Sequence, residues 1–261
     1  MCLVQQGSVV DALTCYVDDQ STTTVNISGG TVGEVQKEES EGSLTINVSG
    51  GMVGVISLED WMGTRFLTIS GGTVSSLSVD LSNSSTLDVT GGVVGSVAFY
   101  GDGSGEANVS GGTIDHITLE TPYLNAYITG GRVGIIESTQ DDDVGITIDL
   151  SGCTVGEFRH NLAYEYMPMA SLYDGAVVDK WIGSGKNEWN IIWAPAEIGK
   201  NCRIERLDHI SDGDGSTLNV YRVAVGANSI VKLSPSVQRL VTLGKLIFNA
   251  DPTAQIINLE D

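Results

Sequence analysis

The chain has 261 residues and carries 33 acidic against 13 basic side chains, a net charge of −20. Such a charge repels nucleic acid and anionic lipid, so we expect neither DNA nor RNA as a partner. No apolar run reaches the 18 residues of a membrane span, so we also expect no transmembrane segment.

The two ends of the chain differ in charge. Residues 1–158 hold 21 acidic and 3 basic side chains, whereas residues 159–261 hold 12 and 10. We therefore expect residues 1–158 and residues 159–261 to contact different partners. The first twenty residues lack the basic start and long apolar centre of a signal peptide, which predicts a protein made and kept in a cytosol, or released from it by lysis.

An eleven-residue phrase recurs seven times, first as VNISGGTVGEV from Val25 and last as IDLSGCTVGEF. The first glycine of successive copies advances by 21, 21, 20, 20, 19 and 22 residues. A fixed period near 20 residues predicts a solenoid. Before the glycines, apolar residues occupy every second position, as in Val25 and Ile27, which is the period of a β-strand and not of a helix.

Two further columns of apolar residues follow the glycines, and we expect both to point inward. The first column is Val32, Val53, Val74, Val94, Ile114, Val133 and Val155. The second is Val35, Ile56, Leu77, Val97, Ile117, Ile136 and Phe158.

The glycines between the strands predict structural corners, because glycine accepts positive φ angles and close backbone approach. These corner residues are Gly29, Gly30, Gly50, Gly51, Gly71, Gly72, Gly91, Gly92, Gly111, Gly112, Gly130, Gly131 and Gly152.

The pattern predicts an all-β fold, a single-stranded parallel β-helix with coils of about 20 residues, followed by an irregular β-rich C-terminal region. A leucine-rich repeat is excluded because no segment has helical spacing. Stacked at roughly 4.8 Å each, seven coils would form a rod about 34 Å long. Variable polar segments such as QKEESEGS are expected to be surface loops.

The chain divides into four predicted regions. The last of them contains strand-like segments without glycine corners, either coils continuing the same axis or a small capping β-domain. The regions are an N-terminal cap or first coil at 1–24, a seven-repeat solenoid at 25–158, an aromatic-rich irregular segment at 159–200, and a β-rich cap, oligomerisation or recognition region at 201–261.

Aromatic residues gather where the phrase fails. They predict either the core of an irregular region or interface, or an exposed platform for sugar rings or a partner protein. As candidate carbohydrate or partner contacts we name Tyr164, Tyr166, Tyr173, Trp181, Trp189 and Trp193.

Acidic side chains could form a glycan-cleaving site, which needs two carboxylates in reach of one glycosidic bond. The repeat places Asp88 next to Asn108 on adjacent coils, and Asp115, His116 and Glu157 on one flank. Scattered solvated acids remain the favoured interpretation, so no catalytic residue is named.

No metal or cofactor is expected. Asp141, Asp142 and Asp143 and the DGDGS from Asp212 to Ser216 lack the full spacing of a calcium loop. The three histidines, His116, His160 and His209, are too far apart in sequence to suggest zinc. Scattered Cys2, Cys15, Cys153 and Cys202 predict free thiols.

The repeated SGGTVG resembles the glycine-cornered β-solenoids of phage fibres and tailspikes and of surface adhesins from gut bacteria. The resemblance covers about residues 20–158 and brings no catalytic motif with it. It implies a parallel homotrimer in which 159–261 joins the chains or meets a receptor.

The favoured hypothesis is a structural, non-catalytic virion protein of a bacteriophage, a fibre, spike or decoration subunit that contacts other virion proteins and a cell-surface glycan. It would be located in the virion. One alternative is a polysaccharide-degrading tailspike-type β-helix enzyme, with clustered carboxylates in a groove. Another is a bacterial adhesin at the cell surface, made as a longer precursor.

Overall fold

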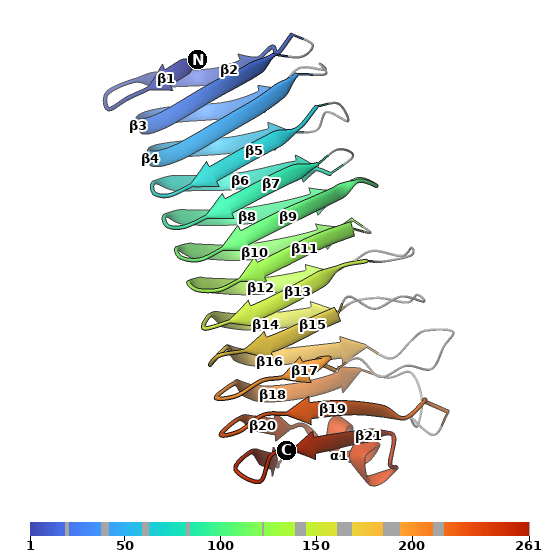
Figure 1. Ribbon diagram of the computed structural model, residues 1–261. Helices are drawn as coiled ribbons and strands as arrows, with labels where there is room; N and C mark the ends of the chain where they lie inside the picture. The colour runs from blue at the N-terminus through green and yellow to red at the C-terminus, as the bar shows by residue number, and fades with distance from the viewer. Residues whose placement is uncertain are drawn as a thin grey trace.

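The computed structural model describes residues 1–18, 21–37, 42–58, 63–81, 84–121, 123–138, 145–160, 169–184, 194–210 and 217–260. Within them the chain winds into a β-solenoid of about ten turns (Figure 1). All strand pairings are parallel and join 22 strands into one sheet. The predicted parallel β-helix is therefore confirmed.

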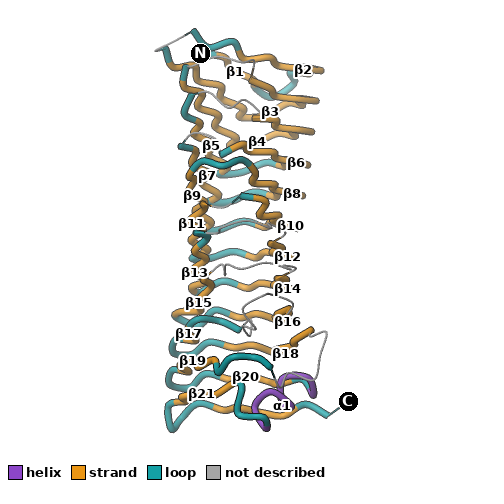
Figure 2. The backbone as a smooth tube through the Cα atoms, turned by 90° about the vertical axis from the view of Figure 1, so that its right-hand side faces the viewer, coloured by secondary structure: helices purple, strands orange, loops and turns teal. Residues whose placement is uncertain are grey.

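Each turn contributes strands to two stacks, which Figure 2 shows from the side. The front stack lies nearer the viewer in Figure 1. It consists of β1 (Cys2–Val4), the first halves of β3 (Thr22–Lys37) and β4 (Ser43–Leu58), β5 (Arg65–Ile69), β7 (Ser85–Val89), β9 (Ser104–Val109), β11 (Tyr123–Ile128), β13 (Thr147–Ser151), β15 (Met169–Tyr173), β17 (Glu197–Ile198), β19 (Tyr221–Val225) and β21 (Leu246–Ala250).

The rear stack pairs in the same parallel manner. It consists of β2 (Val9–Cys15), the second halves of β3 and β4, β6 (Thr73–Asp80), β8 (Val93–Tyr100), β10 (Thr113–Glu120), β12 (Arg132–Ser138), β14 (Thr154–His160), β16 (Val177–Ser184), β18 (Arg203–Ile210), β20 (Ile230–Leu233) and β22 (Gln255–Asn258).

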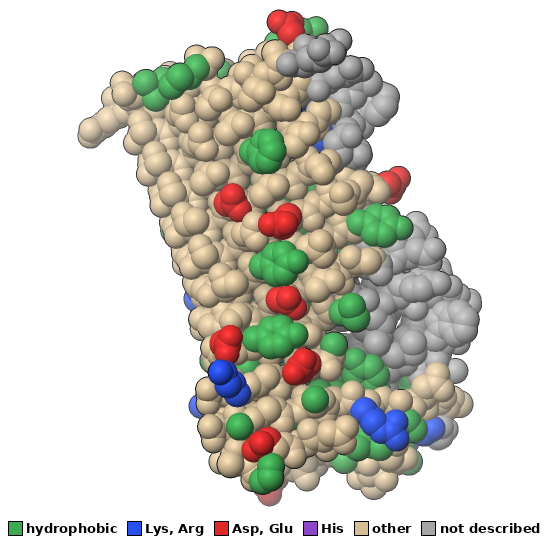
Figure 3. Space-filling view, viewed as in Figure 1, with side chains coloured by type: hydrophobic (Ala, Val, Ile, Leu, Met, Phe, Trp, Pro, Cys, Tyr) green, Lys and Arg blue, Asp and Glu red, His purple; other side chains and the backbone are tan. Residues whose placement is uncertain are grey.

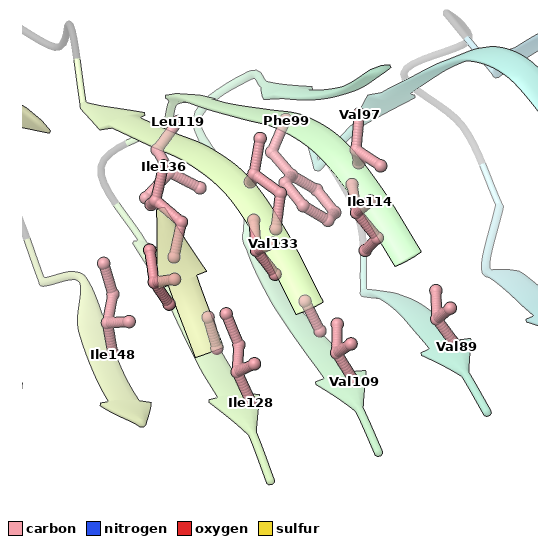
Figure 4. Close-up of a cluster of buried hydrophobic side chains, with 14 of the residues drawn as sticks. Val89, Val97, Phe99, Val109, Ile114, Leu119, Ile128, Val133, Ile136 and Ile148 are labelled. Atoms are coloured by element: carbon pink, nitrogen blue, oxygen red, sulfur yellow. The ribbon is translucent and has the colours of Figure 1, made fainter. Parts of the chain in front are cut away.

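The core lies between the two stacks. Both predicted apolar columns point inward, with every member at most 5% exposed, so this prediction is confirmed. Figure 4 shows side chains of the front stack, such as Val109 and Ile128, facing Ile114 and Val133 of the rear stack. A void of about 10 Å³ beside Phe99 is lined by apolar residues and is too small and too apolar to hold an ordered water.

The paired glycines serve two different purposes at the corner. The second glycine adopts a left-handed backbone, for example φ +83° at Gly51, which other residues accept only with strain. The first glycine has an ordinary backbone, but a Cβ on Gly50 would lie 2.7 Å from the carbonyl oxygen of Ser28 on the coil before it. The corners thus need glycine once for backbone angle and once for space.

The solenoid continues beyond the last copy of the phrase. β14 pairs with β16, β16 with β18, β18 with β20 and β20 with β22. Of the two possibilities left open by the sequence, strands that extend the same stack describe these residues. No helix among the described residues is long and apolar enough to cross a membrane.

One helix, α1 (Pro235–Thr242), lies between β20 and β21 at the C-terminal end of the rod (Figure 1). Ser234 caps it by accepting a hydrogen bond from the backbone N–H of Val237, and Pro235 occupies the first helical position, where no N–H is needed. Val237 and Leu240 are buried and hold the helix against the solenoid.

Candidate functional site

The front face is formed by the outward side chains of the front stack, and an outward column runs along it. Register places Asn26 beside Asn47, and Asp88 beside Asn108. The Asn47 amide donates to Asn26 Oδ1 at 2.8 Å, and the Asn108 amide donates to Asp88 Oδ1 at 3.0 Å. The predicted contact between Asp88 and Asn108 is confirmed, and the hydrogen bonds between coils hold these polar side chains in fixed positions.

The middle of the front face joins acidic, amide and aromatic side chains. Asn108 also donates to Glu106 Oε1 at 2.8 Å, so one amide nitrogen bridges Asp88 and Glu106. Tyr127 follows Asn108 on the next coil, and Tyr123 is 50% exposed. Figure 3 shows hydrophobic and acidic side chains following one another down this face. We call Asp88, Glu106, Asn108, Tyr123, Tyr127 and Asp149 the front patch.

The front patch can hydrogen-bond and stack, the two interactions by which flat surfaces hold sugars. Its carboxylates also have distinct surroundings. Partial burial raises the pKa of Asp149, which favours its protonated form. Asp149 lies three coils from Asp88 along the column, roughly 14 Å at the usual strand spacing, beyond the separations that glycosidases use. Asp88 and Glu106, whose oxygens share one amide, are the closer pair.

The other acids considered from the sequence lie on the rear face, formed by the outward side chains of the rear stack. His116 Nε2 lies 3.4 Å from Glu137 Oε2, and Glu157 binds Arg159 at 3.0 Å and Lys180 at 3.5 Å. His116 and Glu157 stand on one column with Ile135 between them, and Asp115 is exposed. The structure places them on one flank as predicted, but the Glu157 carboxylate is paired with two cationic side chains.

A second group of paired charges surrounds the start of α1. The Arg206 Nε donates to Asp208 at 3.0 Å, and the Ser236 hydroxyl donates to the other Asp208 oxygen at 2.9 Å. Burial alone would raise the pKa of Asp208, but hydrogen bonds from Ser234, Arg206 and Ser236 outweigh it and lower the pKa. These contacts tie α1 to β18 and define a structural anchor.

Of the six aromatic candidates, only Tyr173 and Trp181 belong to the described residues. Trp181 is 3% exposed and stacks on Phe158, with ring centroids 4.2 Å apart and planes at 10°. It is a core residue and is not available to a ligand at the surface. Tyr173 is half-buried at the end of β15. Tyr164, Tyr166, Trp189 and Trp193 lie outside the described residues.

Of the metal and thiol candidates, too, some lie outside the described residues and others lie within them. Asp141 to Asp143 and 212–216 lie outside the described residues, and the described residues contain no group of three or more His, Cys, Asp or Glu placed to hold a metal ion. The four cysteines are free, as predicted, and three of them are buried. Burial raises the pKa of Cys153 to about 11, so its thiol stays protonated and unreactive at neutral pH.

Two buried polar groups were missed from the sequence. Arg65 is 1% exposed and occupies an inward position beside Leu44, where its Nη1 donates to the Asp80 carbonyl at 2.8 Å. His209 is 6% exposed, and its Nδ1 lies 3.3 Å from the Gly183 carbonyl. A charged residue in an apolar column was the available signal for Arg65, but it needs the register to be recognised.

The unfolding free energy should fall in two stages on acidification. Burial lowers the pKa of His209, and bonds to Arg159 and Lys232 lower the pKa values of Glu157 and Glu205. Since folding lowers each pKa, the unfolded chain binds more protons, and stability present at neutral pH is lost below the ordinary values of 6.5 for histidine and 4.5 for glutamate. Urea midpoints at pH 7.5, 5.5 and 3.5 test this.

A His209→Gln variant separates the two stages. It should lose the difference between pH 7.5 and 5.5 while retaining the further fall at pH 3.5. An unchanged midpoint between pH 7.5 and 5.5 in the unaltered chain would contradict the role given to His209.

The solenoid therefore presents two distinct faces, a front face whose side chains can hydrogen-bond and stack, and a rear face that carries paired charges on its later strands. Comparison of the chain with protein-family models, with curated proteins and with solved structures gives no match.

Proposed function

We propose that the chain is a structural, non-catalytic subunit of a bacteriophage particle, a fibre, spike or decoration protein that displays a host-contacting face. The observation that carries this proposal is the regular interior: coil after coil is filled by the same branched apolar columns, so functional groups are displayed on the outside. A rod of this kind holds surface groups at fixed spacing. The resemblance of its phrase to phage fibre solenoids supports the same function.

The front patch is the proposed contact surface for a host glycan. Aromatic rings such as Tyr123 and Tyr127 can cover the apolar face of a sugar, while Asn108 and the carboxylates can bind its hydroxyl groups. Hydrogen bonds to Asp88 on the neighbouring coil and to Glu106 on its own strand already orient Asn108, so little side-chain freedom is lost on binding. In the virion the subunit would associate with other copies, with a homotrimer as the proposed state, and with other virion proteins.

The proposal is tested by binding and product analysis with the full-length chain. Immobilised capsular and cell-wall polysaccharides are the probes, and we expect retention of the protein without release of reducing ends or unsaturated sugars. Tyr127→Ala should weaken retention several-fold, because a stacked ring contributes roughly 1 kcal/mol or more. Thr45→Ala on the same face, distant from the front patch, is the matched control. A chain that binds neither these glycans nor a phage particle contradicts the proposal.

One observation favours a polysaccharide-cleaving enzyme as the second candidate. Because a single Asn108 nitrogen bonds both Asp88 and Glu106, the two carboxylate oxygens are at most about 6 Å apart, within the range used for glycoside hydrolysis. Glycan cleavage that disappears in Glu106→Gln and in Asp88→Asn would establish this alternative. Cleavage that survives both substitutions would place the activity elsewhere or in a contaminant.

A further inference from the structure

Between β4 and β20 the rear face carries almost no net charge. Asp80, at the end of β6, is buried. The other outward residues on the second half of β4, on β6 and on β8 carry no charge at all. We call them the uncharged panel. It consists of Met52, Gly54, Val55, Ser57, Thr73, Ser75, Ser76, Ser78, Val93, Gly95, Ser96 and Ala98.

The uncharged panel is flat and partly apolar. Met52 is 59% exposed, Val93 44% and Val55 39%, whereas the other members have small side chains. Ser96 and Ser76 satisfy one another across coils at 3.1 Å, which lessens their demand for water. Exposed Val and Met on a sheet of Ser, Gly and Thr form a surface that another sheet can approach closely.

The remainder of the rear face, from β10 to β20, carries charges that nearly cancel. Seven outward residues are acidic and six are basic, so this part holds six of the chain's 13 Lys and Arg side chains. They are Asp115, Glu120, Glu137, Glu157, Asp179, Glu205 and Asp208, with Arg132, Arg159, Lys180, Arg203, Arg206 and Lys232. Several are already paired, including Glu157 with Lys180 and Glu205 with Lys232.

Charge therefore restricts how two copies can meet. Counting its exposed and half-buried residues, the rear face has a net charge of −1 from β4 to β20, and its uncharged panel has none, whereas the front patch holds three acids and no basic residue. Contact through the front face would bring Asp88, Glu106 and Asp149 toward acids of the second copy. Burying unpaired like charges strongly disfavours such a contact.

The rear face is also large enough for a stable contact. Nine coils at roughly 4.8 Å, with strands of four to eight residues at roughly 3.3 Å per residue, give a footprint of about 1,000 Å². A standard interface needs about 800 Å² from each partner.

We infer that the rear face is the surface through which copies of this chain associate, side by side and with parallel axes. In that arrangement the uncharged panel of one copy contacts the uncharged panel of the next. The acidic and basic residues from β10 to β20 of one copy face the same set of residues on the other. This inference rests on the proposed assembly of the subunit and specifies the face that makes it. It leaves the front patch exposed on the outside of the assembly.

Light scattering of the full-length chain and of matched charge variants tests the inference. Val93→Glu and Val93→Lys both place like charges at a self-contact, so both should reduce the solution mass from two or three chains to one. Val93→Lys is the sharper variant, because it makes the net charge less negative and would favour association if general repulsion were the only factor. Met52→Glu changes a second residue of the uncharged panel and should likewise reduce the solution mass to one chain.

Phe66→Glu and Phe66→Lys on the front face are the controls, since Phe66 is 46% exposed and stands at an outward strand position like Val93. They should leave the mass unchanged, and circular dichroism should show equal folding of all variants. A monomeric unaltered chain overturns the inference, as does an oligomer that persists in all three panel variants. Retained glycan binding by a monomeric panel variant separates this inference from the proposed function, because the front patch would still act.

Discussion

Replacing Gly72 by alanine should lower the unfolding free energy by about 3 kcal/mol, from a left-handed backbone and a steric clash together. Gly72 has φ +75°, and an added Cβ would lie 2.7 Å from the Gly51 carbonyl oxygen on the preceding coil. The atoms that the added Cβ would meet are backbone atoms of a paired sheet, so they cannot move without disturbing the strands beside them. Thermal unfolding should show a midpoint lower by roughly 6–12 °C.

Gly152→Ala is the matched control for this substitution. Gly152 also has a left-handed backbone, at φ +58°, but the nearest atom to an added Cβ is the Thr129 carbonyl oxygen at 3.6 Å, an ordinary contact. Only the backbone strain remains, about 1 kcal/mol. Equal losses for the two variants would show that close packing between corners contributes little, and that backbone angle alone explains the repeated glycines.

The structure of the seven copies of the phrase is well predicted from the sequence, because each copy contains the residues that determine its strands and its corner. Strand alternation fixes which residues point inward, and the inward positions of Val32 and Val53 follow from it directly. The corner glycines mark where one strand ends and the next begins, so the register between coils could be predicted without coordinates.

The later coils were not predicted because their corners lack the paired glycines of the repeated phrase. The left-handed backbone appears there at Asp174, Asn201 and Asn228, with φ between 46° and 58°. Asparagine and aspartate tolerate this conformation better than other side chains, so they can take the left-handed position of the second glycine. Glycine remains at these corners only singly, as at Gly199 and Gly226, where an added Cβ would meet the backbone of the preceding coil. The Asn228 side-chain amide also donates to Asn201 Oδ1 at 3.3 Å, so a hydrogen bond links these two successive corners. A search of the sequence for Asn or Asp at intervals of 27 residues would have found Asp174, Asn201 and Asn228.

The candidate site was predictable only in part. Asp88 and Asn108 were placed together from the repeat alone, whereas the bridge from Asn108 to Glu106 depends on the side-chain rotamer. The charge pairs of the rear face, such as Glu157 with Lys180, join residues 23 positions apart across a coil of irregular length. Their partners cannot be identified until the strand register beyond Phe158 is known.

Trp181→Ala should lower the unfolding free energy by about 3–5 kcal/mol, the usual cost of removing a large buried aromatic side chain. Thr154 pairs with Val177, and Val177 pairs with Arg203, so the coils lengthen here to 23 and 26 residues. In the inward column Phe158 and Trp181 replace the aliphatic residues of earlier coils, and both are almost fully buried. Their stacked rings fill a position that alanine would leave as a cavity.

Chemical denaturation measures this loss, with two variants that separate its causes. Trp181→Phe keeps an aromatic ring on Phe158 and should cost less than half as much as alanine. Tyr123→Ala, at a residue 50% exposed, should stay within about 0.5 kcal/mol of the unaltered chain. Because Trp181 is buried, Trp181→Phe should also leave glycan retention unchanged, whereas a loss of binding without a loss of stability would return Trp181 to the contact residues. The aromatic residues near the end of the phrase would then belong to recognition, and the core of the wider coils would have to be filled by other side chains.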